Sequence, residues 1–236
     1  MKYSILVPFF NRAKEFRLSL ESYNHWYGDR KDVEILVGED PKNTDCILPL
    51  VGQYPRLNIR VVNDCGHEAC FCPAPIFNRL AEEAAGEVFI LTNPESVHMT
   101  NILDWIDRNY PVLSSYLIFA CEAGIVADSN QAFPLKYQHH LWYQHSEHNN
   151  RMLHFCSAIP RNMYYGVGGF DESYARGIAY DDNDFIQKIR VLGIPCVAVD
   201  DQRTVHVEHD RSYISDSSKI LLNREYYMKK WRREIA

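Results

Sequence analysis

The sequence has no apolar run long enough to cross a membrane. A transmembrane helix needs about 20 predominantly apolar residues, and the 236 residues of the chain contain no such stretch. The opening segment, MKYSILVPFFNR, has too short an apolar run for a secretory signal, and Pro8 interrupts it. We therefore expect neither export nor a stable membrane span.

An excess of basic charge is also missing. The formal net charge is −6, from 25 Lys and Arg against 31 Asp and Glu, which argues against a dedicated nucleic-acid binder. The chain has seven cysteines, an odd number, and we see no export signal. Free thiols in a reducing cytosol are therefore expected. We predict a cytoplasmic protein; the basic residues near the C-terminal end leave peripheral contact with a membrane surface open.

Internal repeats, low-complexity tracts and flexible linkers are absent, which favours one α/β domain. Short apolar runs bounded by turn residues alternate with amphipathic segments, a pattern typical of a parallel sheet with crossover helices. Residues 128–154 are polar, aromatic and rich in His, and are expected to leave the core. The expected strands are 3–8, 33–38, 57–62, 88–92, 116–121, 197–200 and 204–209, and the expected helices are 13–27, 75–85, 101–109, 181–190 and 221–233.

The stretch from Gly86 to His98 organises the site prediction. Its apolar run, VFILT, predicts a strand buried on both faces, and Pro94 ends the strand because it has no amide hydrogen to donate. Glu95 therefore follows the carboxyl end of a core strand. In open α/β sheets ligands bind at that edge.

Five short motifs follow one another along the chain: Val-Pro-Phe-Phe-Asn-Arg at 7–12, Glu-Asp at 39–40, Asn-Pro-Glu at 93–95, Gly-Gly-Phe-Asp-Glu at 168–172 and Asp-Asp at 181–182. In this order they resemble the motifs of the inverting GT-A glycosyltransferases of family two. A paired acid normally ends the second strand of that family, and a D-x-D normally ends a later one.

The resemblance implies a GT-A (Rossmann-like) fold, with a mixed, mostly parallel sheet flanked by helices. Residues 1–98 would form a nucleotide-sugar half, 99–210 an acceptor half and 211–236 a helical tail. The implied activity is metal-dependent, inverting transfer of one sugar from a nucleotide-diphosphate sugar, with UDP favoured, to a hydroxyl. The acceptor stays open among a glycan, a lipid-linked sugar and a modified nucleic acid. The Q-x-x-R-W element of processive synthases is missing, which favours single transfers.

The resemblance also implies a divalent metal, Mn²⁺ or Mg²⁺, on the donor diphosphate. Glu95 stands where the family places its main ligand, and a late His is the second. We favour His206 over His209, because an i, i+3 spacing puts two residues on opposite faces of a strand. His209 would then be a surface or acceptor-loop residue.

A carboxylate within hydrogen-bond reach of the acceptor hydroxyl would act as general base. The resemblance assigns this role to Asp182, with Asp181 as the second choice. Both acids also lie in the first turn of a helix, where they stabilise the helix dipole without any catalytic role. The donor nucleotide and phosphates are expected to contact Pro8, Phe9, Asn11, Arg12, Glu39, Asp40, Asn78, Arg79 and Asn93.

Two departures from the family pattern keep other interpretations open. Asn93 replaces the first Asp of the D-x-D, and Phe77 replaces an Arg. An inactive sugar- or nucleotide-binding module is one alternative; a nucleotidyltransferase is the other, although the loop after the first strand is not rich in Gly. The cluster from Cys65 to Cys72 is open between a structural zinc, a disulfide and a plain loop.

Overall fold

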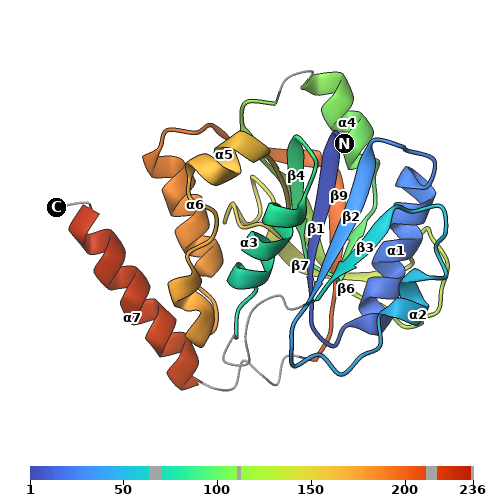
Figure 1. The fold of residues 1–236 in the computed structure, drawn as a ribbon, viewed down its shortest axis with the longest axis horizontal. Coiled ribbons are helices and arrows are strands. Elements are labelled where there is room, and N and C mark those ends of the chain that lie inside the picture. Colours follow the sequence, from blue (N-terminus) through green and yellow to red (C-terminus); the bar gives the residue numbers. More distant parts are fainter. Residues whose placement is uncertain (64–70, 111–112, 211–216, 235–236) are drawn as a thin grey trace.

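A nine-stranded sheet runs through the molecule (Figure 1). The computed structural model describes residues 1–63, 71–110, 113–210 and 217–234. The strands are β1 Tyr3–Phe9, β2 Val33–Glu39, β3 Ile59–Val62, β4 Val88–Thr92, β5 Ser96–His98, β6 Tyr116–Ile125, β7 Gln138–Gln144, β8 Cys156–Pro160 and β9 Cys196–Val207. The helices are α1 Ala13–Tyr27, α2 Leu48–Val51, α3 Ala74–Glu83, α4 Ile102–Asn109, α5 Arg161–Gly166, α6 Asp181–Val191 and α7 Ser217–Glu234, with a 3₁₀ turn, η1, at Glu172–Arg176.

The first four strands confirm the predicted parallel arrangement. β1 pairs in parallel with β2 and with β4, and β2 pairs in parallel with β3. Every residue of β1 and of β4 is buried, as expected for strands covered on both faces. Parallel strands end at one edge of the sheet, so the loops after β1, β2 and β4 meet there.

Two apolar cores lie on the two faces of the sheet. Alternate residues of β1 divide between them: Ile5 faces the side covered by α1 and α4, and Leu6 faces the side covered by α3, α5 and α6. Phe16, Leu20 and Tyr23 of α1 are buried in the first core, on the face that the helical spacing predicts. Figure 1 shows these helices on either side of the strands.

The second half of the sheet is mixed, and it differs from the predicted strands. Most residues of β7, within 128–154, lie outside the core as expected, but β7 still pairs with β6 and so belongs to the sheet. β8, which the sequence did not single out, lies antiparallel between β4 and β6. The two predicted late strands form one 12-residue strand, β9, whose pairing with β6 shifts register between Phe119 and Ala120. A bulge interrupts the alternation of buried and exposed residues, so the sequence pattern predicts two strands where the structure has one.

The C-terminal helix α7 lies outermost, beside α6 (Figure 1). It is longer than the predicted 221–233 and is not solvated all round, since Asn223 and Trp231 are buried. Among the described residues, no helix combines the length and the apolar character needed to cross a bilayer.

Candidate active site

Glu95 lies in the turn between β4 and β5, and three backbone contacts fix that turn. The hydroxyl of Ser19 on α1 donates to the Pro94 carbonyl at 2.7 Å. The Ser96 amide donates to the Asn93 carbonyl at 3.1 Å, and the Val207 amide of β9 donates to the Glu95 carbonyl at 2.9 Å. The carboxylate is therefore held between the end of β4 and the end of β9.

Two histidines converge on that carboxylate. Nε2 of His206, near the end of β9, lies 3.1 Å from Oε1 of Glu95. Nε2 of His209, two residues beyond the strand, lies 3.4 Å from the same oxygen. One ligand atom from each of the three side chains lies within 4.8 Å of the others, and this is the one such cluster found among the described residues.

The prediction that His206 and His209 face opposite ways is wrong. Strand alternation applies only inside a strand, and β9 ends at Val207. The chain turns after that residue and brings His209 back toward Glu95. The description of His209 as a surface residue is also wrong, since its side chain is only 4% exposed.

Electrostatics favour an ionised carboxylate with imidazole partners. Burial by itself raises the pKa of Glu95, but hydrogen bonds and charge from His206 and His209 outweigh it and hold the pKa well below its ordinary value. Nδ1 of His209 lies 2.8 Å from the Asp210 carbonyl. With a cation bound, an Nδ1–H donated to that oxygen would leave the lone pair of Nε2 free to act as a ligand.

These three residues fit a divalent cation. All three side chains are nearly buried, and each aims a donor atom at one point. Nε2 of His206 is the ring nitrogen that faces Glu95, and its Nδ1 is buried with no hydrogen-bond partner among the described residues. Two imidazoles and a carboxylate suit a transition metal such as Mn²⁺ better than Mg²⁺, which prefers oxygen ligands.

The acidic pair opens α6 after an unusual turn. Ala179 and Tyr180 both have left-handed backbone angles, with φ of 62° and 69°. Such angles are rare for residues with a Cβ and cluster at functional sites. Asp181 is buried, and one of its carboxylate oxygens has no hydrogen-bond partner within the described part of the chain. Asp182 is half-buried.

Both acids of the pair are harder to ionise than usual. Burial, and then the charge of Asp182, raises the pKa of Asp181 to about 7. Burial also raises the pKa of Asp182, although its hydrogen bond from the Asn183 amide and the positive charge of Arg151 oppose the shift. A carboxylate whose pKa approaches the working pH is a more effective base.

Residues 151–155, just before β8, lie near both Glu95 and the acidic pair. The Phe155 ring stacks on Tyr143 of β7 at 5.0 Å, and both rings meet His206 edge-on, at 6.0 and 5.0 Å. The same segment carries Arg151, whose charge acts on Asp182. Glu95 and Asp182 are thus linked through one short stretch of chain beside the end of β4.

Tyr116 gives a second link to the acidic pair. The charge of Asp182 helps to raise the pKa of Tyr116, whose hydroxyl donates to Ser157 on β8 at 3.0 Å. Ser157 pairs with Leu91 of β4, four residues before Glu95. Both links place the acidic pair near the carboxyl end of β4.

The loops after β1 and β2 are tied together by the predicted donor residues. Asn11, at φ 47°, accepts the Thr44 amide through its side-chain oxygen at 2.7 Å. Oε1 of Glu39 accepts from the Asn43 amide group at 2.9 Å, and Oδ1 of Asp40 accepts the Lys42 amide at 2.8 Å in a tight turn. These residues shape the edge of the sheet.

Arg12 lies beside the loop that carries His209. Its guanidinium donates to the Asp210 carbonyl at 3.2 Å, the same oxygen that His209 contacts. Pro8 and Phe9 are buried, and Phe9 packs on Phe16 with ring centres 5.7 Å apart. The Phe9 side chain therefore belongs to the core and not to a pocket wall, which corrects the prediction.

Asn78 and Arg79 on α3 have other partners. The oxygen of the Asn78 amide accepts from Tyr164 and Phe170, and its nitrogen donates to Phe170 and Glu172. This amide thus holds the Gly-Gly-Phe-Asp-Glu turn, and a donor contact would break one of these bonds. Arg79 pairs with acids of its own helix. These contacts do not favour the predicted donor roles, which stay predictions.

Sequence reasoning missed two exposed rings at this edge. Phe10 follows β1 and is 41% exposed, and Phe71 is 42% exposed. The Lys42 ammonium lies 6.0 Å from the first ring centre and 4.5 Å from the second. Exposed rings beside a strand end are a usable signal for nucleobase contact. Of the predicted Cys65–Cys72 cluster, residues 64–70 lie outside the described ranges; Cys72, which is described, is buried.

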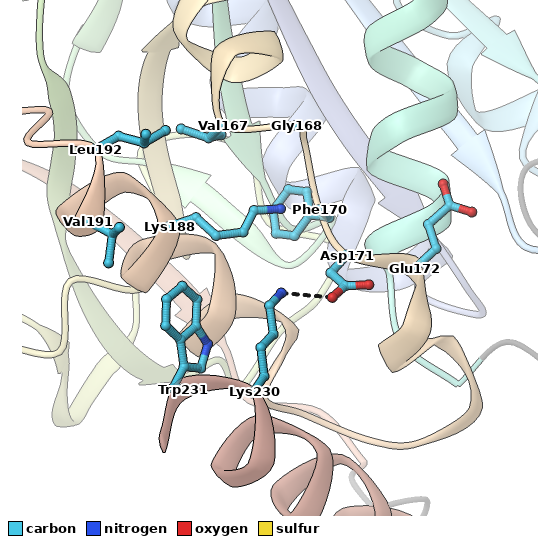
Figure 2. Close-up of a pocket in the computed structure, with 10 residues that line it drawn as sticks. All are labelled: Val167, Gly168, Phe170, Asp171, Glu172, Lys188, Val191, Leu192, Lys230 and Trp231. Atoms are coloured by element: carbon cyan, nitrogen blue, oxygen red, sulfur yellow. Dashed lines mark hydrogen bonds and ion pairs between the residues drawn. The ribbon is translucent and has the colours of Figure 1, made fainter. Parts of the chain in front are cut away.

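A shallow hollow of about 480 Å³ lies elsewhere, between the Gly168–Glu172 turn, the C-terminal half of α6 and α7 (Figure 2). Lys188, Leu192 and Trp231 are among the side chains that line it. The acidic pair opens α6, and neither Asp181 nor Asp182 is among the residues that line the hollow. The hollow is therefore separate from the candidate active site.

Comparisons with known proteins agree with this architecture. No protein-family model matches the chain, and no curated protein sequence matches it. Among solved structures, S. aureus TarS 1–349 in complex with UDP-GlcNAc has a TM-score of 0.67 and 16% identity over 92% of this chain. The mannosyltransferase PcManGT from Pyrobaculum calidifontis, in complex with GDP-Man and Mn²⁺, has a TM-score of 0.65 and 15% identity over 97% of this chain.

The chain has the GT-A glycosyltransferase fold. This confirms the fold that the motif order predicts. The chain covers 61% of the TarS structure and 64% of the mannosyltransferase, so both neighbours are considerably longer. At such low identity the likeness establishes the fold, and the chemistry has to be argued from the site.

Proposed function

We propose that this protein is a metal-dependent glycosyltransferase that moves one sugar from a nucleotide-diphosphate sugar to a hydroxyl acceptor. The observation that carries the proposal is the convergence of Glu95, His206 and His209 after the end of β4. In a GT-A fold this edge is where a donor is expected. The two structural neighbours are complexes with UDP-GlcNAc and with GDP-Man, which supports a nucleotide-sugar donor.

Glu95, His206 and His209 would hold the cation, and Mn²⁺ suits two imidazoles better than Mg²⁺. A cation in this position supplies Lewis-acid stabilisation of the charge on a departing diphosphate. Arg12, beside His209, adds a positive charge on the same side. Asn93, two residues before Glu95, would present a neutral amide toward the donor.

The nucleotide would lie over the loops after β1 and β2. Glu39 and Asp40 offer acceptors for an N–H of the base or for ribose hydroxyls, and Phe10 offers an open aromatic face. We propose a uracil base, whose N3–H either carboxylate could accept. The two neighbours differ here, since TarS is complexed with a uridine nucleotide sugar and the mannosyltransferase with a guanosine one.

Asp182 would be the general base, and Asp181 would be its buried partner. Asp182 is the more exposed of the two, so an acceptor hydroxyl reaches it first. Burial raises the pKa of both acids, which matches the base to neutral pH. One base and no covalent intermediate give a single displacement, and hence inversion at the anomeric carbon. The missing processive element favours one transfer per encounter.

The test is a thermal-shift series followed by turnover. UDP, GDP and CMP are each added with and without Mn²⁺ and Mg²⁺, and donors of the stabilising nucleotide are then screened for hydrolysis. We expect a diphosphate to raise the melting temperature only with the metal, and Asp182→Asn to lower turnover by about 10²- to 10⁴-fold. Metal-dependent stabilisation without any turnover by the parent would instead indicate the inactive binding module that Asn93 permits.

A further inference from the structure

The backbone turn that leads into the acidic pair is strained, and contacts from outside the turn have to stabilise it. Ala179 and Tyr180 are consecutive residues with left-handed backbone angles, which side chains with a Cβ rarely adopt. Tyr180 makes no side-chain cap hydrogen bond to the start of α6. Some other part of the molecule has to stabilise this backbone.

Asn223 of α7 supplies that hold. Its side-chain amide donates to the Ala179 carbonyl at 2.7 Å and to the Tyr174 carbonyl at 3.0 Å. Asn223 is 1% exposed, whereas its neighbour Arg224 is exposed. Asn is a weak helix former in a helix interior. Its presence here is explained by the two hydrogen bonds it gives to the turn.

Gly177 allows α7 to come this close. Its φ of −121° and ψ of −171° are ordinary extended angles, so glycine is not needed for the backbone conformation. A Cβ at this position would lie 2.2 Å from Oδ1 of Asn223 and 2.7 Å from the Lys219 carbonyl oxygen. Glycine is needed for the close approach of the helix. The Lys219 carbonyl also accepts the Ile178 amide at 3.2 Å.

A second set of contacts from α7 holds the first turn of α6. Asp184 is fully buried and accepts from Lys230 at 2.7 Å and from the Trp231 indole at 2.9 Å, both on α7. Lys230 also bonds Asp171 of the Gly-Gly-Phe-Asp-Glu turn at 2.8 Å, as Figure 2 shows. α7 therefore holds the acidic segment on both sides of Asp181 and Asp182.

We propose that Asn223 is a positioning residue for the general base: by bonding the Ala179 carbonyl, it sets the turn that aims Asp182 at the acceptor. This inference rests on the proposed function, because it takes Asp182 as the base. It assigns α7 a role in turnover that a solvated basic tail would not have.

The experiment compares Asn223→Ala, Asn223→Asp and the matched control Arg224→Ala, each as the full chain. Asn223→Asp keeps the shape and removes the donors. We expect both Asn223 variants to lower kcat by about 10- to 100-fold, the cost of a small misplacement, with the donor KM and the Mn²⁺-dependent thermal shift unchanged. In Asn223→Ala the acidic limb of the pH–rate profile should move to lower pH, because water then reaches the pair. Arg224→Ala should match the parent.

Two outcomes would overturn the inference. One is an Asn223→Ala protein that folds and keeps the parent kcat and pH profile. The other is a parallel loss of kcat, donor KM and Mn²⁺ response, which would mean a general structural role. If the parent turns over no donor at all, the proposed function fails separately. The effect of Asn223 on the acidic pair is then measured separately, by titrating ¹³C-labelled aspartate carboxyls by NMR. A lower apparent pKa of the pair in Asn223→Ala supports the positioning contact, and an unchanged pKa overturns it.

Discussion

Glu95 and Asp181 are both buried acids at the candidate site, yet their pKa values move in opposite directions. Exposure is 8% for Glu95 and 4% for Asp181, so burial alone predicts the same upward shift. The difference lies in the partners. Two imidazoles face Glu95 and lower its pKa, whereas Asp181 faces another carboxylate and its pKa rises to about 7.

The comparison separates two kinds of chemistry within one region of the molecule. An acid that stays ionised beside imidazoles is prepared to hold a cation. An acid pair with raised pKa values is prepared to exchange a proton near neutral pH. The strained, left-handed turn at Ala179 and Tyr180 precedes the acid pair, which we call the proton side of the site. The turn that carries Glu95, the metal side, is instead held by several hydrogen bonds.

The largest effect on turnover should come from removing the carboxylate of Glu95. Glu95→Gln removes the one anionic ligand and leaves two buried imidazoles. We expect the Mn²⁺-dependent thermal shift to vanish and turnover to fall by at least about 100-fold, since loss of outer-shell partners alone costs 10- to 100-fold.

Glu122→Gln is the matched control for that variant. Glu122 is also a buried carboxylate, bonded to Tyr137, His139 and Arg203, but it lies outside the metal cluster. We expect the Glu122→Gln protein to be less stable than the parent and to keep the Mn²⁺-dependent thermal shift. An unchanged Mn²⁺ response in Glu95→Gln would remove the metal centre from the proposal.

Asp181→Asn tests the proton side through stability. Between the ordinary Asp pKa of about 3.9 and about 7, the native state keeps a proton that the unfolded state releases, so the parent loses stability as pH rises. Asn cannot ionise. We therefore expect Asp181→Asn to gain about 1–4 kcal/mol relative to the parent at pH 8, and to show little of this gain at pH 4.

Urea unfolding of both proteins at pH 4, 6 and 8 measures this gain. The m-values should agree, so that the change reflects stability and not compactness. A difference between the two proteins that is constant across the three pH values would contradict the raised pKa of Asp181.

His154 sharpens the comparison, because it is buried without a charged partner. Its ring lies between Phe77 and Phe170, with ring centres 5.2 and 5.0 Å away, and burial lowers its pKa to about 4. The unfolded state binds a proton below about pH 6.5, and the native state does so only near pH 4. The parent should therefore lose stability as pH falls through this window.

His154→Phe should remove that acid sensitivity, with a difference of about 1–3 kcal/mol between pH 7 and pH 4. Acid unfolding monitored by circular dichroism measures it. Buried His98, whose pKa burial lowers to about 3, is common to both proteins and cancels in the comparison. Equal acid sensitivity in both proteins would mean that His154 is not held neutral.

The first half of the fold could be predicted because its signals are local. The apolar runs of β1, β2 and β4 are buried, and Pro94 marks where β4 gives way to the turn that carries Glu95. The acidic pair and the helix that it opens could be located in the same way. In each case the neighbours in sequence supply the physical reason.

The second half could not be predicted as well, because its signals are distant. β7 is largely exposed and polar, and only its pairing with β6 makes it a strand. β9 bends at a register shift that depends on β6. Phe9 shows the reverse error: its place beside the Asn11 loop suggested a pocket, and its packing on Phe16 puts it in the core.

The sequence by itself determined the parallel strands, the carboxylate after β4 and the acids that open α6, since each follows from a periodicity or a turn within a few residues. Only the tertiary structure decided that His209 joins His206 on Glu95, and that Asn223 braces the turn before Asp181. Both depend on where β9 ends and on how closely α7 approaches, and these are set by contacts between segments far apart in the chain.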